Sequence, residues 1–327
     1  MITRSRVALA LLLAILIASS IQLSDSKSES HLFVSKVSAS SVDNVVVYFL
    51  DVGQGDSILI KMENKSILID GGPKTASTTL LGFLSSVNVT HLNFIIATHP
   101  HEDHIGGLVA VMQSIAVDSI LYNGYNYTTQ IFQDFMTLAL VHNLTIASRN
   151  QVYQLTTTTN FTILNPIQPL EFSDINANSV VIKLQVNNVS FLFTGDATID
   201  SEQSMLNAGL NLQSDVLKVG HHGSNTSTSQ AFLDTVNPSY AVISAGINNT
   251  YGHPHDETIQ KLVNKGVTIY GTFASGTIVF STDGNLLTVQ GNPQNIPEFA
   301  LTVLPILMLS MLAVSVVLKK RKFNVIR

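Results

Sequence analysis

The densest group of side chains able to do chemistry lies in the run THPHEDHIGG, residues 98–107. Three histidines and two acids occupy six consecutive positions of this run: His99, His101, Glu102, Asp103 and His104. Imidazole nitrogen and carboxylate oxygen are ligands for Zn²⁺ and neighbouring divalent ions. The chain contains no cysteine, so any metal bound here must be held by histidine and acid. The other interpretation is a solvated polar loop that contains histidines by chance.

The spacing of these residues suits two metal ions better than one. In a loop, His99 and His101 can face one way while Asp103 and His104 face the other, so the segment can supply two ions about 3.5–4 Å apart. A single ion would leave some of these donors unused.

The flanking residues predict the elements that must hold this cluster. Residues 92–97 form a short β-branched and aromatic run, which indicates a buried strand, and residues 105–112 have helical spacing. We therefore expect the cluster in a strand-to-helix loop.

Strands and helices alternate through the middle of the chain. The patterns predict strands at 45–50, 57–62, 66–69, 92–97, 180–186, 189–194, 215–219, 241–244, 267–270, 277–280 and 286–290, and helices at 75–87, 105–112, 130–142, 229–236 and 256–265. Such a mixture of β-meanders and βα units suits two sheets with helices outside them.

Further candidate ligands follow strands in the second half of the chain. Asp196 comes just after the strand 189–194, where its carboxylate can reach a metal and bridge two ions. His221 and His222 follow the strand 215–219. Adjacent residues on an extended chain point apart, so one of the pair is expected to be a ligand and the other to orient a ligand or contact substrate. Either histidine can take either role.

Six motifs that occur along the chain together resemble a known family. They are FLDVGQGDS at 49–57, IDGG at 69–72, HPHEDHIGG at 99–107, LFTGDA at 192–197, VLKVGHHGS at 216–224 and YGHPH at 251–255. Over about residues 44–290 the chain resembles the metallo-β-lactamase fold hydrolases, and among them the extracellular hydrolase domain of ComEC-type DNA-uptake proteins. The resemblance implies an α/β (α+β) fold, a four-layer αββα sandwich of two sheets flanked by helices. It places this catalytic domain at residues 44–292.

The resemblance also implies which residues form the site. The implied metal ligands are His99, His101, Asp103, His104, Asp196, His221, His222 and His253. Asp196 would bridge two ions, and His253 would complete the second. Residues implied to contact substrate or orient ligands are Ser224, Asp56, Asp70 and His255, although the two aspartates and Ser224 are also explained as turn residues.

One position departs from the wider family pattern. Many enzymes of this fold place a further metal-binding histidine between the first cluster and the bridging aspartate. In this chain residues 176–179 read Asn-Ala-Asn-Ser, as in the ComEC-like branch. One of His221 and His222 can make good that deficit.

The ligand inventory predicts a hydrolase that uses one or two divalent ions, Zn²⁺ or alternatively Mn²⁺. A metal-bound water has its pKa lowered toward about 7, and a second ion stabilises the leaving oxygen of an in-line displacement. This chemistry suits phosphodiester hydrolysis, with Asp103 as the catalytic residue that positions or deprotonates the water. No Gly-x-Ser-x-Gly motif indicates a serine nucleophile.

Composition leaves the substrate open between nucleic acid and a phosphorylated surface polymer. The chain has a net charge of -5, 12% charged residues, 7% aromatic residues and no tryptophan, whereas nucleic-acid grooves combine Lys and Arg with stacking rings. Lys183 and Lys218 flank the site in sequence but do not make a channel. The alternative function is a non-catalytic cell-surface binding or scaffold module that keeps the fold. A β-lactamase activity rests on fold analogy alone.

The two ends of the chain predict export and membrane tethering. The catalytic domain is therefore expected outside the cell membrane, held by a C-terminal helix or by a lipid anchor that replaces it. The Pro-Glu-Phe run resembles a sorting signal. The expected segments are 1–23, a signal peptide or N-terminal anchor; 24–43, a Ser-rich linker; 293–299, a linker with Pro-Glu-Phe; 300–318, a transmembrane helix; and 319–327, a basic cytoplasmic tail.

Overall fold

The computed structural model of the protein describes residues 43–294. The segments expected at 1–23, 300–318 and 319–327 lie outside the described residues, as do nearly all of the linker 24–43 and most of the linker 293–299. Within the described range, no helix combines the length and the apolar character needed to cross a bilayer.

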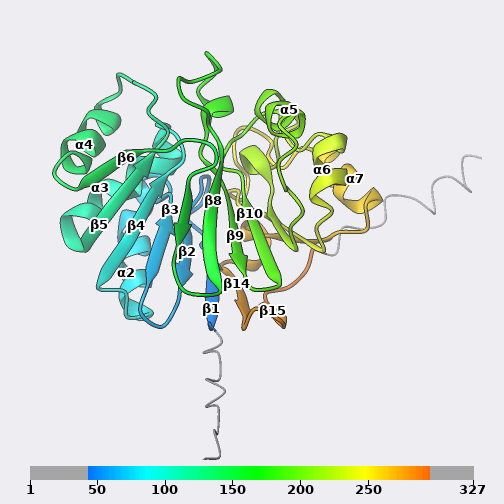
Figure 1. The fold of residues 1–327 in the computed structure, drawn as a ribbon, viewed down its shortest axis with the longest axis horizontal. Coiled ribbons are helices and arrows are strands. Elements are labelled where there is room, and N and C mark those ends of the chain that lie inside the picture. Colours follow the sequence, from blue (N-terminus) through cyan, green and yellow to red (C-terminus); the bar gives the residue numbers. More distant parts are fainter. Residues whose placement is uncertain (1–42, 295–327) are drawn as a thin grey trace, which may run out of the picture. The chain divides into compact units, whose positions relative to one another are not determined.

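Two β-sheets form the centre of the described chain (Figure 1). The eight strands of the first sheet, in spatial order, are β15 (Leu287–Gln290), β14 (Ile278–Thr282), β1 (Val45–Phe49), β2 (Ile58–Lys61), β3 (Ser66–Ile69), β4 (His91–Ala97), β5 (Ala116–Tyr122) and β6 (Asn143–Ile146). The seven described strands of the second are β13 (Thr268–Gly271), β12 (Tyr240–Ile243), β11 (Val216–Lys218), β10 (Val189–Phe193), β9 (Val181–Val186), β8 (Thr159–Asn165) and β7 (Val152–Gln154).

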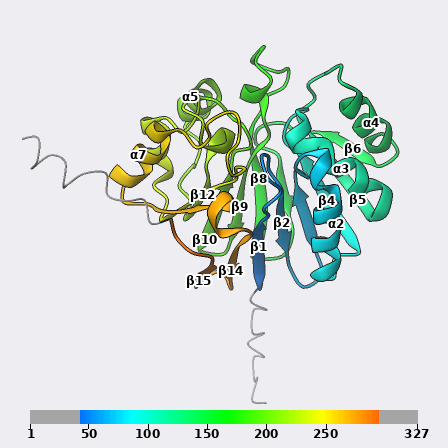
Figure 2. The same ribbon diagram turned by 180° about the vertical axis from the view of Figure 1, so that it is seen from behind.

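The helices of residues 43–294 lie on the outer faces of these sheets, as Figures 1 and 2 show from opposite sides. They are α2 (Ser77–Ser86), α3 (Glu102–Ser114), α4 (Gln130–Ala139), α5 (Ile199–Asn207), α6 (Gln230–Val236), α7 (Asp256–Asn264) and α8 (Thr272–Ser275), with 3-10 turns η1 (Lys74–Ala76), η2 (Asn176–Asn178) and η3 (Gly220–Gly223).

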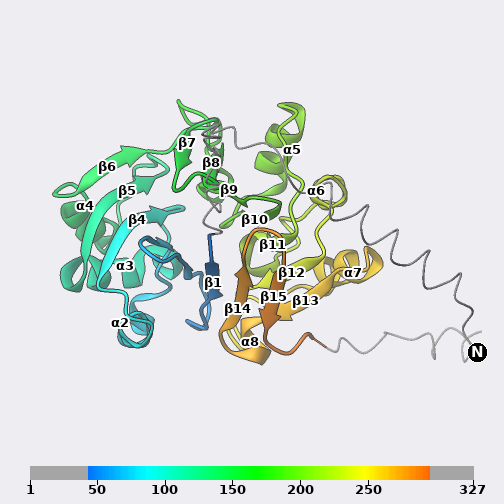
Figure 3. The same ribbon diagram turned by 60° about the horizontal axis from the view of Figure 1, so that its bottom comes forward.

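Each sheet has its own group of covering helices, which Figure 3 shows on opposite sides of the strands. Leu84 of α2, Leu108 of α3 and Phe135 of α4 share one buried cluster with Leu68 and Ile95 of the first sheet. Helices α5, α6 and α7 bury residues in a separate cluster with the second sheet: Met205, Leu233 and Leu262 with Leu217 and Ala241. The expected two-sheet sandwich with helices outside is confirmed.

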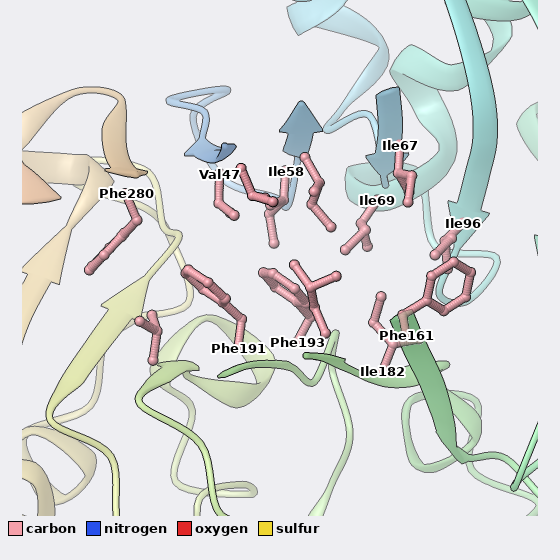
Figure 4. Packing of buried hydrophobic residues seen from close by; sticks show 14 of the residues in the cluster. Val47, Ile58, Ile67, Ile69, Ile96, Phe161, Ile182, Phe191, Phe193 and Phe280 are labelled. Atoms are coloured by element: carbon pink, nitrogen blue, oxygen red, sulfur yellow. The ribbon is translucent and has the colours of Figure 1, made fainter. Parts of the chain in front are cut away.

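The main core fills the space between the two sheets (Figure 4). In β1, Val45, Val47 and Phe49 are buried while the residues between them are half-buried, because successive side chains of a strand point to opposite faces. Phe49 meets Phe193 of the second sheet with ring centroids 5.9 Å apart. Burying one such side chain contributes about 1.5–3 kcal/mol, so this interface holds the two sheets together.

Several elements were not predicted from the sequence pattern, namely strands β5 to β8 and helices α5 and α8. In β5, Asp118 breaks the apolar run, yet it is exposed at the start of the strand, where it lies 2.7 Å from Nε2 of His91 in neighbouring β4. In α5 the buried residues include Ser201 and Glu202, so the helix shows little apolar periodicity. Glu202 accepts hydrogen bonds from the backbone of a distant loop instead.

Parallel strand pairing gathers the chain segments that carry the candidate ligands. Strands β3 and β4 are parallel in the first sheet, and β10 and β11 are parallel in the second. The carboxyl ends of parallel strands lie at one edge, where α/β proteins place their ligands. Asp70, Thr98, Asp196 and His221 follow these four strands.

Candidate metal centre

The histidine cluster spans the end of a loop and the first turn of a helix. His101 is the extended N-cap residue of α3, with φ -71° and ψ 148°, so Asp103 and His104 already belong to the helix. The expectation that the whole cluster lies in a loop is therefore wrong. Glu102 and Asp103 favour this early start because negative charge stabilises the amino end of a helix.

His104 is oriented by the buried Asp70. Its Nδ1–H donates to Asp70 Oδ2 at 2.8 Å, and the same carboxylate accepts from the Thr98 backbone N–H at 2.8 Å and the Thr98 hydroxyl at 2.7 Å. This arrangement fixes the imidazole tautomer and directs Nε2 into the site. Nε2 has no hydrogen-bond partner and lies 3.3 Å from Asp196 Oδ2.

His222 is held in the same way from the second sheet. Its Nδ1–H donates to the carbonyl of Ser244 at 2.9 Å and lies 3.4 Å from Asp56 Oδ1. Nε2 faces two carboxylates, Asp103 Oδ2 at 3.2 Å and Asp196 Oδ1 at 3.5 Å. Asp103 and His222 are thus brought together from opposite sheets.

His99 lies beside His104 at the same oxygen of Asp196, with ring centroids 4.1 Å apart, and His101 lies beside His99. His99 Nε2 is 3.7 Å from Asp196 Oδ2 and 3.0 Å from His101 Nδ1. His99 Nδ1–H donates to the Thr98 hydroxyl at 3.0 Å, with Ser179 Oγ at 3.4 Å. The two imidazoles therefore present facing nitrogens beside the same carboxylate.

Both His221 and His222 approach Asp196, which corrects the expectation that they point apart. The chain is not extended here: His221 has φ 49° and ψ 47°, and His222 has φ 56° and ψ 22°, both left-handed. Non-glycine residues adopt this conformation uncommonly, and two in succession make a sharp turn that brings both side chains toward the centre. His221 Nε2 lies 3.6 Å from Asp196 Oδ2, and the same nitrogen lies 3.4 Å from Asn176 Nδ2.

Charges within the centre balance one another. Burial raises the pKa of Asp196, but the charges of His104 and His222 hold that pKa well below its usual range. Burial lowers the pKa of each of these histidines, and the carboxylates, Asp196 foremost, raise it well above the usual value. The pKa of His99 is well below its usual range because burial and the charge of His104 disfavour its protonation. The raised pKa values favour protonated His104 and His222, whose positive charges offset the carboxylates. A divalent cation bound here would displace these protons and supply the positive charge instead.

The arrangement fits divalent metal ions. Among residues 43–294, buried polar atoms without a hydrogen-bond partner include His104 Nε2, His222 Nε2 and Asp196 Oδ1. Each of the two imidazole nitrogens lies within 3.5 Å of an oxygen of Asp196. Four overlapping groups have ligand atoms within 4.8 Å of one another: His99, His104 and Asp196; Asp103, His104 and His222; Asp56, Asp196 and His222; and Asp56, Asp70 and His104. Buried polar atoms are normally paired, so this convergence indicates a ligand between them.

The remaining expected site residues lie farther from the carboxylates. The ring of His253 is 5.6 Å from that of His221, centroid to centroid, and its pKa is lowered to about 4 by burial and by the neighbouring histidines. His255 Nδ1 accepts from the backbone N–H of Asn225 at 3.0 Å. Ser224 Oγ lies 3.0 Å from Thr226 Oγ1, within its own turn. The structure thus brings His253 to the edge of the centre, while His255 and Ser224 hold the adjoining loop.

Four contributing residues were not singled out from the sequence: Thr98, Asn176, Ser179 and Ser244. Thr98 lies inside the first motif, and Asn176 and Ser179 mark the position where the wider family has a histidine. Ser244 contributes only a backbone carbonyl, which leaves no trace in a sequence.

A cavity of about 670 Å³ opens over the centre. Its walls come from both halves of the domain and are formed by Val52, Gly53, Gln54, Pro73, Thr75, His101, Glu102, Asp103, Tyr127, Thr129, Asn176, Asp196, His221, His222, Tyr251 and His253. The cavity gives a substrate direct access to Asp103 and Asp196.

Known proteins resemble this chain at the level of sequence. ComE operon protein 3 of Bacillus subtilis (strain 168) is 30% identical over 254 residues, which cover 72% of this chain and 32% of that protein. Competence protein ComA of Neisseria gonorrhoeae is 33% identical over 232 residues, 70% of this chain and 31% of that protein. The chain thus spans about a third of the length of these relatives.

A solved structure of similar fold is the metallo-beta-lactamase fold protein YhfI from Bacillus subtilis, with a TM-score of 0.49 and 12% identity over 73% of this chain and 100% of that one. The sequence model of the family described as "Metallo-beta-lactamase superfamily" matches residues 50–247, more than half of the chain. Over about 70% of its length the chain is similar to the ComEC-type relatives just named, and it belongs to the metallo-beta-lactamase superfamily.

Proposed function

We propose that the chain is a metal-dependent phosphodiesterase that uses water as the nucleophile. The observation that carries the proposal is the convergence of His104 Nε2, His222 Nε2 and Asp196 Oδ1, all buried and without hydrogen-bond partners, beneath an open cavity. When bound there, divalent ions would activate water and neutralise charge that develops on a phosphoryl group.

We assign the ligands to two ions that share Asp196. His99, His101 and His221 would hold one ion, because His99 Nε2 and His221 Nε2 lie 3.7 and 3.6 Å from Asp196 Oδ2 and His101 Nδ1 lies 3.0 Å from His99 Nε2. Asp103, His104 and His222 would hold the other, because His222 Nε2 lies between Asp103 and Asp196. His104 Nε2 is also 3.3 Å from Asp196 Oδ2 and would face both ions. His221 then takes the place of the histidine that residues 176–179 lack. Zn²⁺ is the expected metal and Mn²⁺ the alternative.

Asp103 is the proposed catalytic residue. Its side chain is 30% exposed to the cavity, so it can contact both the centre and a substrate. Burial raises the pKa of Asp103, and the charge of His104 together with the hydrogen bond and charge of His222 brings it below its usual range. Because Asp103 lies both at the centre and in the cavity wall, we assign it the role of accepting a hydrogen bond from the attacking water and orienting it.

We also propose that the domain, residues 44–292, works outside the cell membrane. The supports are the apolar segment 300–318 with its basic flank 319–327 and the exported-protein pattern of residues 1–23. The names of the relatives, a competence protein and a competence operon protein, support nucleic acid as substrate, with a phosphorylated surface polymer as the other candidate.

The test measures metal content and turnover on the full-length protein, purified in mild detergent. We expect about two equivalents of divalent metal and hydrolysis of bis-p-nitrophenyl phosphate and single-stranded DNA. The double variant Asp103→Ala/His104→Ala should lose both metal and turnover. The matched control is His91→Ala, which removes an exposed histidine paired with Asp118 away from the centre and should keep both.

Two results would contradict the proposal. Bound metal without turnover on either substrate would favour the non-catalytic binding module. Turnover that survives in the double variant would place the active centre elsewhere.

A further inference from the structure

The described domain is strongly acidic. Residues 43–294 carry eight Lys and Arg against nineteen Asp and Glu, a net charge of -11, whereas the full chain has a net charge of -5. The other nine cations of the chain lie outside these residues. Nucleic-acid binding along the backbone draws its affinity from Lys and Arg that neutralise phosphates. The net charge of the domain is negative, like that of the phosphates, so the domain lacks the excess of Lys and Arg that such binding requires.

Six of the eight cations of residues 43–294 are engaged within the domain. They are Lys61 with the Val87 carbonyl, Arg149 with the Leu164 carbonyl and Ser204, Lys183 with the carbonyls of Asn211 and Gln213, Lys218 with Asp56, Lys261 with Glu257 and the Ser227 carbonyl, and Lys265 with Asp234. Carbonyl and carboxylate partners already satisfy these groups.

The side chains of the other two cations do not line the main cavity, although Lys74 stands between two residues that do, Pro73 and Thr75. Lys65 closes the turn between β2 and β3, at the opposite end of these strands from Asp56 and Asp70. Lys74 lines a separate cavity between η1, α3 and α4. The charged side chains that do line the main cavity, histidines aside, are Glu102, Asp103 and Asp196.

Two tyrosines provide the flat surfaces of this cavity. Tyr251 is 66% exposed, and its ring stacks on that of His253 with centroids 5.7 Å apart and an interplanar angle of 19°. Tyr127 meets His101 edge to face, with centroids 5.9 Å apart. An exposed ring beside the centre can stack on a nucleobase or another uncharged ring.

We infer that the cavity takes a phosphodiester bearing a single phosphate charge, flanked by an uncharged flat ring that stacks on Tyr251, as in a dinucleoside monophosphate. This inference rests on the proposed phosphodiesterase function. Within residues 43–294, no Lys or Arg lines this cavity, so the metal centre would supply the positive charge that attracts one phosphate. Further phosphates of a polyanionic strand would be repelled by Glu102, Asp103 and the net negative charge of the domain, and no Lys or Arg of the described cavity lining binds them.

Turnover tests this substrate class on the full-length protein at fixed metal concentration. A thymidine dinucleotide is compared with an oligothymidylate of about 20 nucleotides, between about 50 and 200 mM salt. We expect equal kcat/KM per phosphodiester bond, and a slope of log kcat/KM against log salt no steeper than about -0.7, the value for one single-strand phosphate contact. An oligonucleotide preference of about tenfold per bond, with a slope of about -3 or steeper, would overturn the inference.

Binding gives a second measurement that does not depend on turnover. Fluorescence anisotropy of the labelled oligonucleotide with metal-free protein should show no salt-sensitive complex at micromolar concentrations. The basic residues 319–322 lie outside the described domain, so the same titration is done on the variant Lys319→Ser/Lys320→Ser/Arg321→Ser/Lys322→Ser. Tight, salt-sensitive binding that persists in this variant would overturn the inference, and binding lost with it would uphold it.

The stacking surface is tested with Tyr251→Ala and the matched variant Tyr251→Phe. Alanine should raise KM for the dinucleotide about tenfold, and phenylalanine, which keeps the ring, should restore it. Equal KM values for all three proteins would remove Tyr251 from the inference.

Bis-p-nitrophenyl phosphate separates a failure of the inferred substrate class from a failure of the proposed phosphodiesterase function. If this compound is hydrolysed while the oligonucleotide is preferred over the dinucleotide, only the substrate class is wrong. If neither it nor the nucleotides are hydrolysed, the phosphodiesterase function itself fails.

Discussion

Single residues behind the metal centre hold it in shape, and Lys218 is a fully buried cation among them. Its Nζ lies 2.5 Å from Asp56 Oδ2, and the two side chains are 0% and 2% exposed. The same ammonium donates to the Gly195 carbonyl at 3.3 Å, next to Asp196. One cation thus connects the loop of Asp56, which lies against His222, with the loop of Asp196.

Removing only the cation of this pair should destabilise the fold strongly. Lys218→Met leaves Asp56 buried without its partner, so we expect the free energy of unfolding to fall by about 3–5 kcal/mol. Urea unfolding in the presence of a chelator measures this without a contribution from metal. The double variant Lys218→Met/Asp56→Asn removes both charges and should recover most of the loss. A double variant no more stable than the single one would show that the ion pair is not the cause.

At the scale of elements, the close contact between α3 and the loop after β3 positions half of the centre. Gly107 N–H donates to the Gly72 carbonyl at 2.9 Å, and the Gly71 N–H donates to the His104 carbonyl at 2.7 Å. A Cβ atom on Gly107 would stand 2.1 Å from the Gly71 carbonyl oxygen. The glycine allows the helix to lie against the loop, and this sets where Asp103 and His104 point.

A methyl group at this contact should move the ligands. Gly107→Ala is expected to lower metal affinity about 10- to 100-fold and the free energy of unfolding by about 1–3 kcal/mol. The matched control is Gly82→Ala in α2, where a Cβ atom meets nothing within 4 Å; it should stabilise the protein by up to about 1 kcal/mol. Competition with a chelating dye and thermal unfolding give both quantities. Unchanged metal affinity in Gly107→Ala would contradict this account of α3.

At the scale of the whole domain, the centre joins the two sheets. His99, Asp103 and His104 come from the end of β4 and the start of α3 in the first sheet's half, while Asp196 and His222 follow β10 and β11 of the second. A bound ion would therefore link two halves that otherwise meet through the apolar core. Binding to the folded state alone stabilises that state by mass action.

Removal of metal should lower the thermal stability of the protein. At a thousandfold excess over Kd the stabilisation is about 4 kcal/mol, which for a domain of this size corresponds to about 8–16 °C in Tm. Differential scanning calorimetry before and after dialysis against EDTA measures the shift. Asp103→Ala/His104→Ala should show no response to the chelator. A wild-type Tm that does not change on chelation would indicate that no ion links the sheets.

The sequence determined the ligand inventory and most of the elements around it. The cluster of His99, His101, Asp103 and His104 is local, so its composition and spacing can be read from consecutive residues. Long apolar strands such as β4 and β10 were predicted within one or two residues, because buried strands follow a simple pattern. Strand β5 and helix α5 were missed because a paired Asp118 and a buried Glu202 obscure their apolar periodicity.

The tertiary structure alone decided how these residues combine. Asp103 and His222 are 119 positions apart in the chain, yet parallel pairing in two different sheets brings them within 3.2 Å. The roles of His221 and His222 depended on a left-handed turn, which a local pattern of residue types does not specify. Six of the eight cations of residues 43–294 likewise contact partners more than ten positions away in the sequence, namely Lys61, Arg149, Lys183, Lys218, Lys261 and Lys265. Such contacts are fixed by the packing of the whole fold, and for this reason the sequence indicated a metal centre while the structure assigned its geometry.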